Sequence, residues 1–252
     1  MSNKLAEMTT DQARDAVRGS PLVIIPVGAQ EQHGGGMAMS TDTVRAVGLA
    51  DLVAERLAGR AVIAPPVSYG VSPHHMAFAG TVTLSPATFQ SVLRDVVDSL
   101  YQHGWRQFLV ITGHGGNNAA LSVLAQEYLT HNDLTFAWTP ITPLVSDLIA
   151  GMEVSQVHGH AGEAETAQML YLAPELVQAD HLEPGATRLD ELSTPARLSR
   201  QAQGPRLSVG FDEYHKRGVL GDPRRATAAD GRLLVETAAD RIAAFADELL
   251  TA

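Results

Sequence analysis

The sequence has 252 residues, a formal net charge of −10 and no cysteine. Without cysteine there are no disulfides or thiolate ligands, so any metal ion must be held by His, Asp or Glu side chains. The acidic balance argues against a nucleic-acid partner, because binding to phosphates needs a basic surface. No apolar run approaches the ~20 residues of a membrane span, and residues 1–17 lack the apolar core of a signal peptide. We therefore expect a cytoplasmic protein that contacts neither nucleic acid nor membrane.

Apolar runs alternate with helical patterns, and no linker-like stretch divides the chain, so we expect one domain over residues 1–252. Apolar runs rich in β-branched residues predict buried strands at 21–28, 61–65, 108–112 and 134–138, and a short strand at 81–84. Amphipathic spacing predicts helices at 42–57, 118–128, 162–172 and 226–250, and another after Pro86. Residues 186–222 are polar and loop-rich and receive no assignment. Strands separated by helices predict an α/β fold with a mostly parallel central sheet flanked by helices.

The first polar cluster follows the strand predicted at residues 21–28. Glu31 and His33 come directly after it, and Asp42 lies at the start of the next helix. Sites in open α/β sheets lie at the carboxyl ends of the strands, which is where these residues fall. A plain structural role also fits, since Asp42 suits a helix cap and the other two residues suit an ordinary polar loop.

Two further clusters also lie where a helix begins. A Gly-His-Gly-Gly turn occupies residues 113–116, and its glycines let the backbone approach another group closely. Such a turn also suits anion binding through its N–H groups, although it lacks the Lys-Ser/Thr pair of a P-loop. Another predicted helix is preceded by His158 and His160 and begins with Glu163 and Glu165. The two glutamates would also interact favourably with the helix dipole.

Together the clusters supply two histidines and three carboxylates from three separate segments. The candidate metal ligands are Glu31, His33, Asp42, His114 and Glu163. Neutral imidazole together with carboxylate is a ligand set for zinc, manganese or iron. One carboxylate that bridges two divalent ions about 3.5–4 Å apart allows them to activate water and polarise a carbonyl group together. We therefore expect two divalent metal ions, Zn²⁺, Mn²⁺ or Fe²⁺, as cofactors.

Several stretches of the sequence resemble motifs of the creatininase (creatinine amidohydrolase) family. They are PVGAQEQHG, STDT, YGVS followed by HHMAFAGTVTL, ITGHGGNN, HAGEAET and GVLGDPRRATAADG. These stretches occur in the family's order and cover most of the chain. The resemblance implies a three-layer α/β fold, a centre of two metal ions and a homo-oligomer, usually a hexamer.

The resemblance also implies how the ligands are shared between the two ions. Asp42 corresponds to the ligand that bridges them. Glu31 and His114 correspond to ligands of one ion, and His33 corresponds to a ligand of the other.

Other roles follow from the same resemblance. Creatininase itself has a carboxylate ligand where this sequence has Gly116, and Glu163 is expected to replace it. His160 corresponds to the catalytic histidine that passes a proton to the leaving nitrogen, and Glu165 is expected to orient His160 or a ligand. The residues expected to face the substrate are Ser72, His75, Gly115 and His158.

The expected function is hydrolysis of a C–N bond in a small cyclic amide, lactam or related amide by metal-activated water. Creatininase has an aromatic residue, a glutamate and a tryptophan where this sequence has Gly115, Gly116 and Gln156, which argues against creatinine as the substrate. The alternatives within enzymes are hydrolysis of a formamide, opening of a cyclic ketone and cleavage of a peptide. An alternative from another class is a non-catalytic protein that binds a small molecule or an anion on the glycine-rich turn.

Overall fold

Four parallel strands form the central sheet, and their order brings two of the polar loops together. The computed structural model describes residues 2–131, 133–201 and 203–251. The strands are β1 (Leu22–Val27), β2 (Ala61–Ile63), β3 (Gln107–Thr112) and β4 (Thr135–Pro140), in the order β2-β1-β3-β4. Because β1 and β3 are parallel neighbours, the loops that follow them lie side by side at one edge of the sheet.

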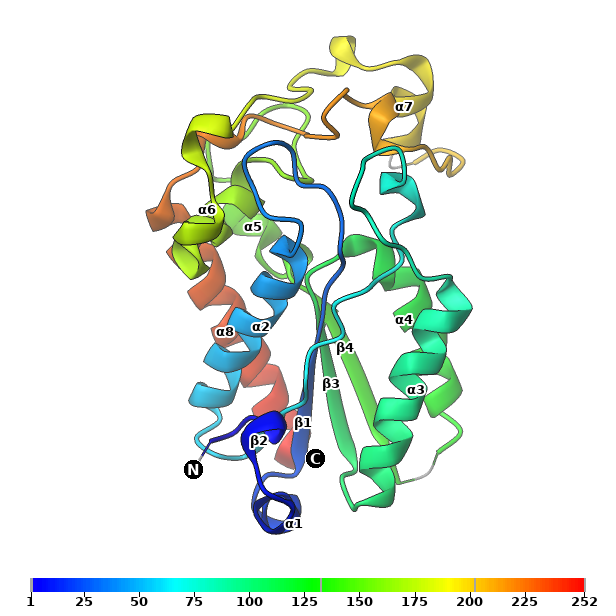
Figure 1. Cartoon of the computed structure of the whole chain (residues 1–252), viewed down its shortest axis with the longest axis vertical. Helices are drawn as coiled ribbons and strands as arrows, with labels where there is room; N and C mark the ends of the chain where they lie inside the picture. Colours follow the sequence, from blue (N-terminus) through cyan, green and yellow to red (C-terminus); the bar gives the residue numbers. More distant parts are fainter. Residues whose placement is uncertain (1, 132, 202, 252) are drawn as a thin grey trace.

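Helices cover both faces of the sheet and give three layers (Figure 1). On one side lie α2 (Thr41–Arg56), α6 (Glu163–Leu172) and α8 (Ala228–Thr251), and on the other lie α3 (Pro86–Gln102) and α4 (Asn118–Tyr128). Leu22 and Ile24 of β1 pack in the core with α2 and α8. Val23 and Ile25 point the other way and pack with α3 and α4. A strand buried on both faces needs a continuous apolar sequence, which explains the run LVIIPV.

Shorter elements surround these layers. They are the helices α1 (Thr10–Gly19), α5 (Ser146–Ile149) and α7 (Thr194–Ser199), with 3₁₀ turns at Leu5–Glu7, Pro73–His75, Gly115–Asn117, Thr142–Val145, Pro174–Leu176, Ala179–His181, Leu189–Glu191, Phe211–Glu213 and Pro223–Arg225. Helix α1 was not predicted, although its capping box is readable in the sequence. Thr9 and Gln12 each accept, through the side chain, a hydrogen bond from the other's backbone N–H.

The structure confirms the α/β fold with a parallel sheet between helices. The strand predicted at residues 81–84 is wrong, because only an isolated antiparallel bridge joins Gln30 and Val82 there. That segment is short because Gly80 adopts a left-handed turn conformation before it and Pro86 begins α3 after it. Among the described residues, none of the helices has both the length and the apolar sequence needed to cross a bilayer.

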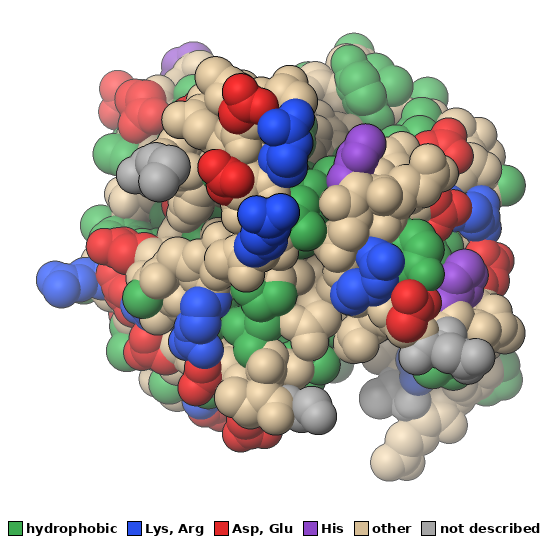
Figure 2. All heavy atoms as spheres, turned by 90° about the horizontal axis from the view of Figure 1, so that it is seen from below, with side chains coloured by type: hydrophobic (Ala, Val, Ile, Leu, Met, Phe, Trp, Pro, Cys, Tyr) green, Lys and Arg blue, Asp and Glu red, His purple; other side chains and the backbone are tan. Residues whose placement is uncertain are grey.

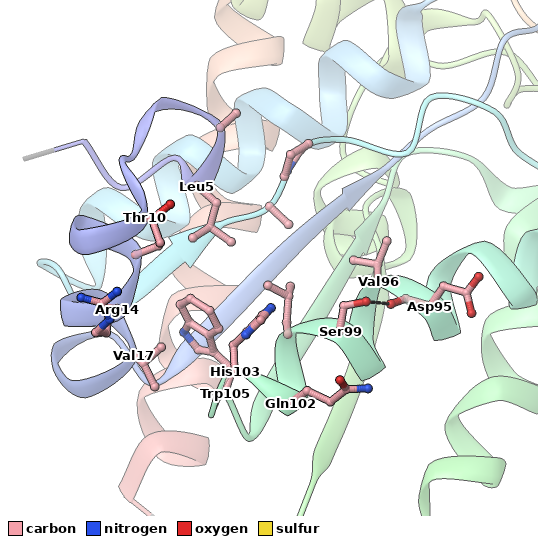
Figure 3. A pocket seen from close by; sticks show the side chains of 15 residues that line it. Leu5, Thr10, Arg14, Val17, Asp95, Val96, Ser99, Gln102, His103 and Trp105 are labelled. Carbon is pink, nitrogen blue, oxygen red and sulfur yellow. Dashed lines mark hydrogen bonds between the residues drawn. The ribbon is translucent and has the colours of Figure 1, made fainter.

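The end of the molecule that carries α1 lies away from the carboxyl ends of the strands. Figure 2 views this end, where basic side chains are interspersed with acidic and hydrophobic ones and form no continuous basic surface. A cavity of about 960 Å³ lies between α1 and α3, where Leu5, Val17 and Trp105 line it (Figure 3). Its lining is mainly apolar and includes none of the predicted site residues.

Two glycines allow the first turn of α2 to press against the ends of β1 and β3. A Cβ atom on Gly28 would lie 2.2 Å from Thr43 Oγ1 and 2.4 Å from its backbone nitrogen. A Cβ atom on Gly113 would lie 2.1 Å from the carbonyl oxygen of Asp42. Neither gap admits a methyl group, so glycine at these positions brings Asp42 close to both strand ends.

The variant Gly113→Ala is therefore expected to lose about 1–3 kcal/mol of unfolding free energy, because α2 must move away from β3. Urea denaturation measures this loss. Gly115→Ala is the matched control from the same turn, since a Cβ atom there meets nothing within 4 Å. Equal stability of the two alanine variants would show that the close approach is unimportant.

Candidate metal centre

Titratable side chains from separate segments meet at the carboxyl ends of the strands. Glu31 and His33 follow β1, His114 follows β3 and Asp42 lies in the first turn of α2; His160 precedes α6 and Glu165 belongs to it. Glu31, His33, Asp42 and His114 are each at most 4% exposed. The parallel sheet therefore gathers these groups in a site that is almost closed to bulk water.

Asp42 stands between two histidines and presents one carboxylate oxygen to each. Its Oδ2 lies 3.3 Å from Nδ1 of His114, and its Oδ1 lies 3.5 Å from Nε2 of His33. On the His114 side, Oε1 of Glu31 is 3.2 Å from the same Nδ1. On the His33 side, Oε2 of Glu165 is 3.8 Å from Nε2. The cluster thus has two halves that share Asp42.

Three histidines each have an outer ring nitrogen, the one that points away from the cluster, in contact with a backbone carbonyl oxygen. Nδ1–H of His33 donates to Glu31 O at 3.2 Å, Nε2–H of His114 donates to Val71 O at 3.0 Å, and Nε2–H of His160 donates to Gln32 O at 2.7 Å. A carbonyl oxygen only accepts, so in the neutral ring each contact places the proton on the outer nitrogen and leaves the inner nitrogen with its lone pair. This orientation is the one that a metal ion requires.

Three inward-facing atoms lack hydrogen-bond partners among the residues that the structure describes. They are Glu31 Oε1, His33 Nε2 and Asp42 Oδ2. One ligand atom from each of these residues lies within 4.8 Å of the others. Buried charged oxygens without a partner are costly, and a cation among them removes that cost. The donor set of imidazole and carboxylate therefore fits zinc, manganese or iron.

The carboxylates strongly change the acidity of the histidines. Burial lowers the pKa of His33, but the adjacent Asp42 carboxylate outweighs burial and raises it to about 9. Burial likewise opposes protonation of His114, but Glu31 and Asp42 raise its pKa well above the usual value. Metal binding requires neutral imidazole, so a cation must displace protons from these two side chains.

A fully buried arginine lies beside the cluster and was missed in the sequence. The side chain of Arg45 is 0% exposed. Its Nη1 donates to Glu165 Oε1 at 2.8 Å and lies 3.5 Å from Asp42 Oδ1. Its Nε donates to Gln168 Oε1 at 2.9 Å. An arginine three residues after Asp42 on the same helix face is the one signal that pointed to it.

The structure corrects the expectation for Glu163, which does not reach the cluster. Its Oε1 accepts hydrogen bonds from Ser155 N, Ser155 Oγ and Asp222 N. Glu165, two residues further along α6, faces His33 instead. Successive residues of a helix are about 100° apart, so two residues separated by two positions point to nearly opposite sides. Glu165 is thus the carboxylate that occupies the place expected for Glu163.

The remaining predicted residues lie around a cavity of about 540 Å³ above the cluster. His75, Gly115, His158 and His160 line it together with Glu31, Asp42 and Glu165. Ser72 does not line this cavity, because it lies behind Glu31 and its hydroxyl donates to Oε2 at 2.7 Å. The expectation that Ser72 faces a substrate is corrected accordingly. His160 Nδ1 is 3.9 Å from Glu165 Oε2, which is too long for a hydrogen bond that would orient it.

Two further aromatic side chains line the cavity, His74 and Phe211, and Phe211 was not predicted. The ring of Phe211 stacks on His75 with centroids 4.3 Å apart. Burial, with the charges of His74 and His114, lowers the pKa of His75 to about 2, so this ring is neutral. Phe211 comes from the stretch 186–222 whose structure the sequence pattern left open, which explains why it was missed.

The family model for creatinine amidohydrolase matches residues 6–246. The chain belongs to the creatininase family. As a member of this family it is a metal-dependent hydrolase that acts on C–N bonds, which agrees with the buried carboxylate and imidazole cluster.

Known relatives of this creatininase-family chain carry different names. The mycofactocin precursor peptide peptidase of Mycolicibacterium smegmatis is 34% identical over 232 residues, covering 88% of this chain and 84% of its own. The creatinine amidohydrolase of Pseudomonas putida is 26% identical over 255 residues, with 89% and 88% covered. Among solved structures, a creatininase with manganese superposes with a TM-score of 0.78 at 26% identity, covering 98% of both chains. A Zn–Zn mutant creatininase gives 0.79, also at 26% identity and 98% of both chains.

Replacing Glu165 by Gln is expected to lower the amount of bound metal, because one charged oxygen is removed from the His33 half. Replacing Glu163 by Gln is the matched control, since this side chain lies outside the cluster. Metal analysis of both purified variants measures the difference. A loss of metal in Glu163→Gln alone would refute the assignment of Glu165.

Binding of Zn²⁺ or Mn²⁺ is expected to release protons, because without metal His33 has a pKa of about 9 and is protonated at neutral pH. Since the proton competes with the cation below this pKa, the affinity must rise as the pH approaches it. Calorimetry in buffers with different heats of ionisation counts the released protons. An affinity that does not change with pH would contradict the geometry described for His33.

Proposed function

We propose that this protein hydrolyses an amide bond with water activated at the buried cluster. The observation that supports this proposal is the convergence of Glu31, His33 and Asp42, whose inward atoms have no hydrogen-bond partner in the described residues. They lie below a cavity large enough for a substrate. An anion-binding protein built on the glycine-rich turn would not need the three converging carboxylates of Glu31, Asp42 and Glu165.

We assign the ligands to the two halves of the cluster. Glu31 and His114 would hold one divalent ion, His33 and Glu165 would hold the other, and Asp42 would bridge them. Ions in such a site lower the pKa of water and polarise the carbonyl group of the substrate.

His160 is the residue proposed to move the proton. Its Nε2–H is fixed on Gln32 O, and its Nδ1 faces the cluster 3.6 Å from Glu31 Oε1. Burial, together with His33 and His75, lowers the pKa of His160, so the ring is neutral and a weak base. It would take a proton only from water that a bound cation has made more acidic. As water adds to the carbonyl carbon and the C–N bond breaks, His160 returns this proton to the nitrogen. The turn at residues 113–116 borders the same cavity and would stabilise the oxyanion.

The cavity favours a substrate larger than a single small ring. Its volume of about 540 Å³ lies in the range of about 300–1,000 Å³ that suits drug-sized ligands. Apolar side chains contribute to its lining, among them Ile141, Pro143 and Ile149. Gln156 does not line the cavity, and its Oε1 accepts a hydrogen bond from Leu189 N.

Among amides, we therefore propose a short peptide with an apolar side chain next to the cleaved bond. The name of the relative from Mycolicibacterium smegmatis, a precursor peptide peptidase, supports this choice over creatinine. A lactam and a formamide stay as the smaller alternatives, since the same centre would serve them. A hexamer, one domain over residues 1–252 and a cytoplasmic location stay predictions from the sequence.

Removal of metal by a chelator is expected to reduce amide hydrolysis at least about a hundredfold, because the ions supply several kcal/mol of transition-state stabilisation. Added Mn²⁺ or Zn²⁺ should restore it. The assay measures the rate at which the same metal-reloaded protein hydrolyses short apolar peptides, lactams, formamides and creatinine. We expect the peptides to be cleaved fastest and creatinine slowest.

Two variants control this experiment. His33→Asn should stay inactive after reloading, whereas His103→Asn, in the cavity beside α1, should behave as wild type. Full activity of the metal-free protein would refute the proposed function, and rapid hydrolysis of creatinine alone would refute the proposed substrate class.

A further inference from the structure

A second cavity lies beside the one above the cluster, at the end of the molecule that carries α7 (Figure 1). Its volume is about 470 Å³. His74 lines both cavities, and Phe211 lines the first whereas the preceding Gly210 lines the second. A Cβ atom on Gly210 would lie 3.8 Å from His74 O, so these two segments meet at the boundary. The two cavities are therefore neighbours on either side of one histidine.

Part of the lining of this second cavity is a stretch of chain whose backbone is unpaired. Leu207, Ser208 and Val209 border the cavity and belong to no helix, strand or turn. Among the described residues, none of their N–H groups or carbonyl oxygens is hydrogen-bonded to another backbone group. Gly210, which follows them, has extended backbone angles of φ −68° and ψ 155°. Unpaired, extended backbone is the surface to which another extended chain adds as a strand.

The elements on either side of this stretch are held in place. The hydroxyl groups of Ser199, at the end of α7, and Tyr214 are hydrogen-bonded to each other. Phe211 stacks on His75, with ring centroids 4.3 Å apart, and so joins the end of the stretch to the wall of the first cavity. The unpaired groups are thus supported at both ends, which lowers the entropic cost of binding a partner chain.

We propose that the second cavity and residues 207–210 form a subsite for the backbone of an extended peptide, next to the cavity in which the amide bond is cleaved. This inference rests on the proposed function and deepens it, because the substrate becomes a chain of several residues. Four residues of extended chain span about 13 Å, so we expect about four residues of the peptide to contribute on this side of the cleaved bond. Backbone pairing adds affinity with little preference for side chains.

A peptide series measures the contribution of this subsite. The starting substrate is the short apolar peptide that the metal-reloaded protein cleaves fastest, with acetylated and amidated ends so that its charge stays constant. Alanine residues are added one at a time at the N-terminus in one series and at the C-terminus in another. In one of the two series we expect KM to fall at least about tenfold over about four residues and then to stay constant, as a few net hydrogen bonds would produce.

Methylation of the backbone nitrogens in the added alanines should abolish most of this fall in KM. It removes the N–H donors of the peptide and keeps its side chains, so it separates backbone pairing from simple apolar contact. This measurement uses the wild-type protein and needs no substitution in the chain.

Ser208→Trp tests the same subsite from the side of the protein. Ser208 is exposed and borders the second cavity, which an indole ring would fill. The ratio of kcat/KM for the longest peptide to that for the shortest should fall from at least about ten in wild type to about one in this variant. Gln203→Trp is the matched control and should keep the wild-type ratio, since Gln203 is exposed and lines neither cavity. If Ser208→Trp fails to fold, the methylated peptides decide the question.

Several results would overturn the subsite while leaving peptide hydrolysis intact. They are a KM that does not change along either series, a fall in KM that methylation leaves unaltered, and a ratio that Ser208→Trp does not lower. A lower molecular mass of Ser208→Trp in light scattering, with a KM independent of peptide length, would show instead that residues 207–210 pair with a second copy of the chain. Hydrolysis of lactams or formamides without cleavage of any peptide would refute the proposed substrate class, and the inference would fall with it.

Discussion

The burial of the Asp42 carboxylate between two histidines is the constraint on which the rest of the site depends. A carboxylate that is 1% exposed needs compensating positive charge close to its oxygens. His33 and His114 supply that charge as protons when metal is absent, which is why the pKa values of both are raised. A metal cation supplies this compensating positive charge more effectively than the two protons do. The electrostatic cost of burying Asp42 is therefore what makes this position select for metal.

The fold places Asp42 there through backbone contacts. Helix α2 begins against the ends of β1 and β3, where Gly28 and Gly113 leave no room for a side chain. The first turn of a helix also favours a negative charge, so Asp42 is suited to its local structure as well as to the site. This double suitability explains why a helix cap and a metal ligand could not be told apart in the sequence. Only the three-dimensional positions of His33 and His114 distinguish a helix cap from a metal ligand at Asp42.

Much of the fold and half of the site could be predicted from the sequence. Buried parallel strands produce continuous apolar runs, and parallel strands bring their following loops together, which located Glu31, His33 and His114. The choice between Glu163 and Glu165 could not be made, because both begin the same helix and its rotation is set by packing against α2 and α8. Arg45 was hidden for a different reason. A buried arginine looks in sequence like a solvated one, and its spacing of three residues from Asp42 does not show which acceptors surround it.

The missing ligand at Gly116 and the open cavity follow from the same local packing. A Cβ atom on Gly116 would lie 2.3 Å from both His114 Nε2 and Val71 O, so the turn excludes any side chain at that position. A carboxylate must then come from elsewhere, and α6 provides Glu165, held by Arg45. Because Gly115 and Gly116 have no side chains, the turn leaves space above the cluster, and both glycines border the cavity. A carboxylate on the helix in place of one on the turn therefore leaves the turn free to border the cavity, which supports the proposal of an amide larger than creatinine.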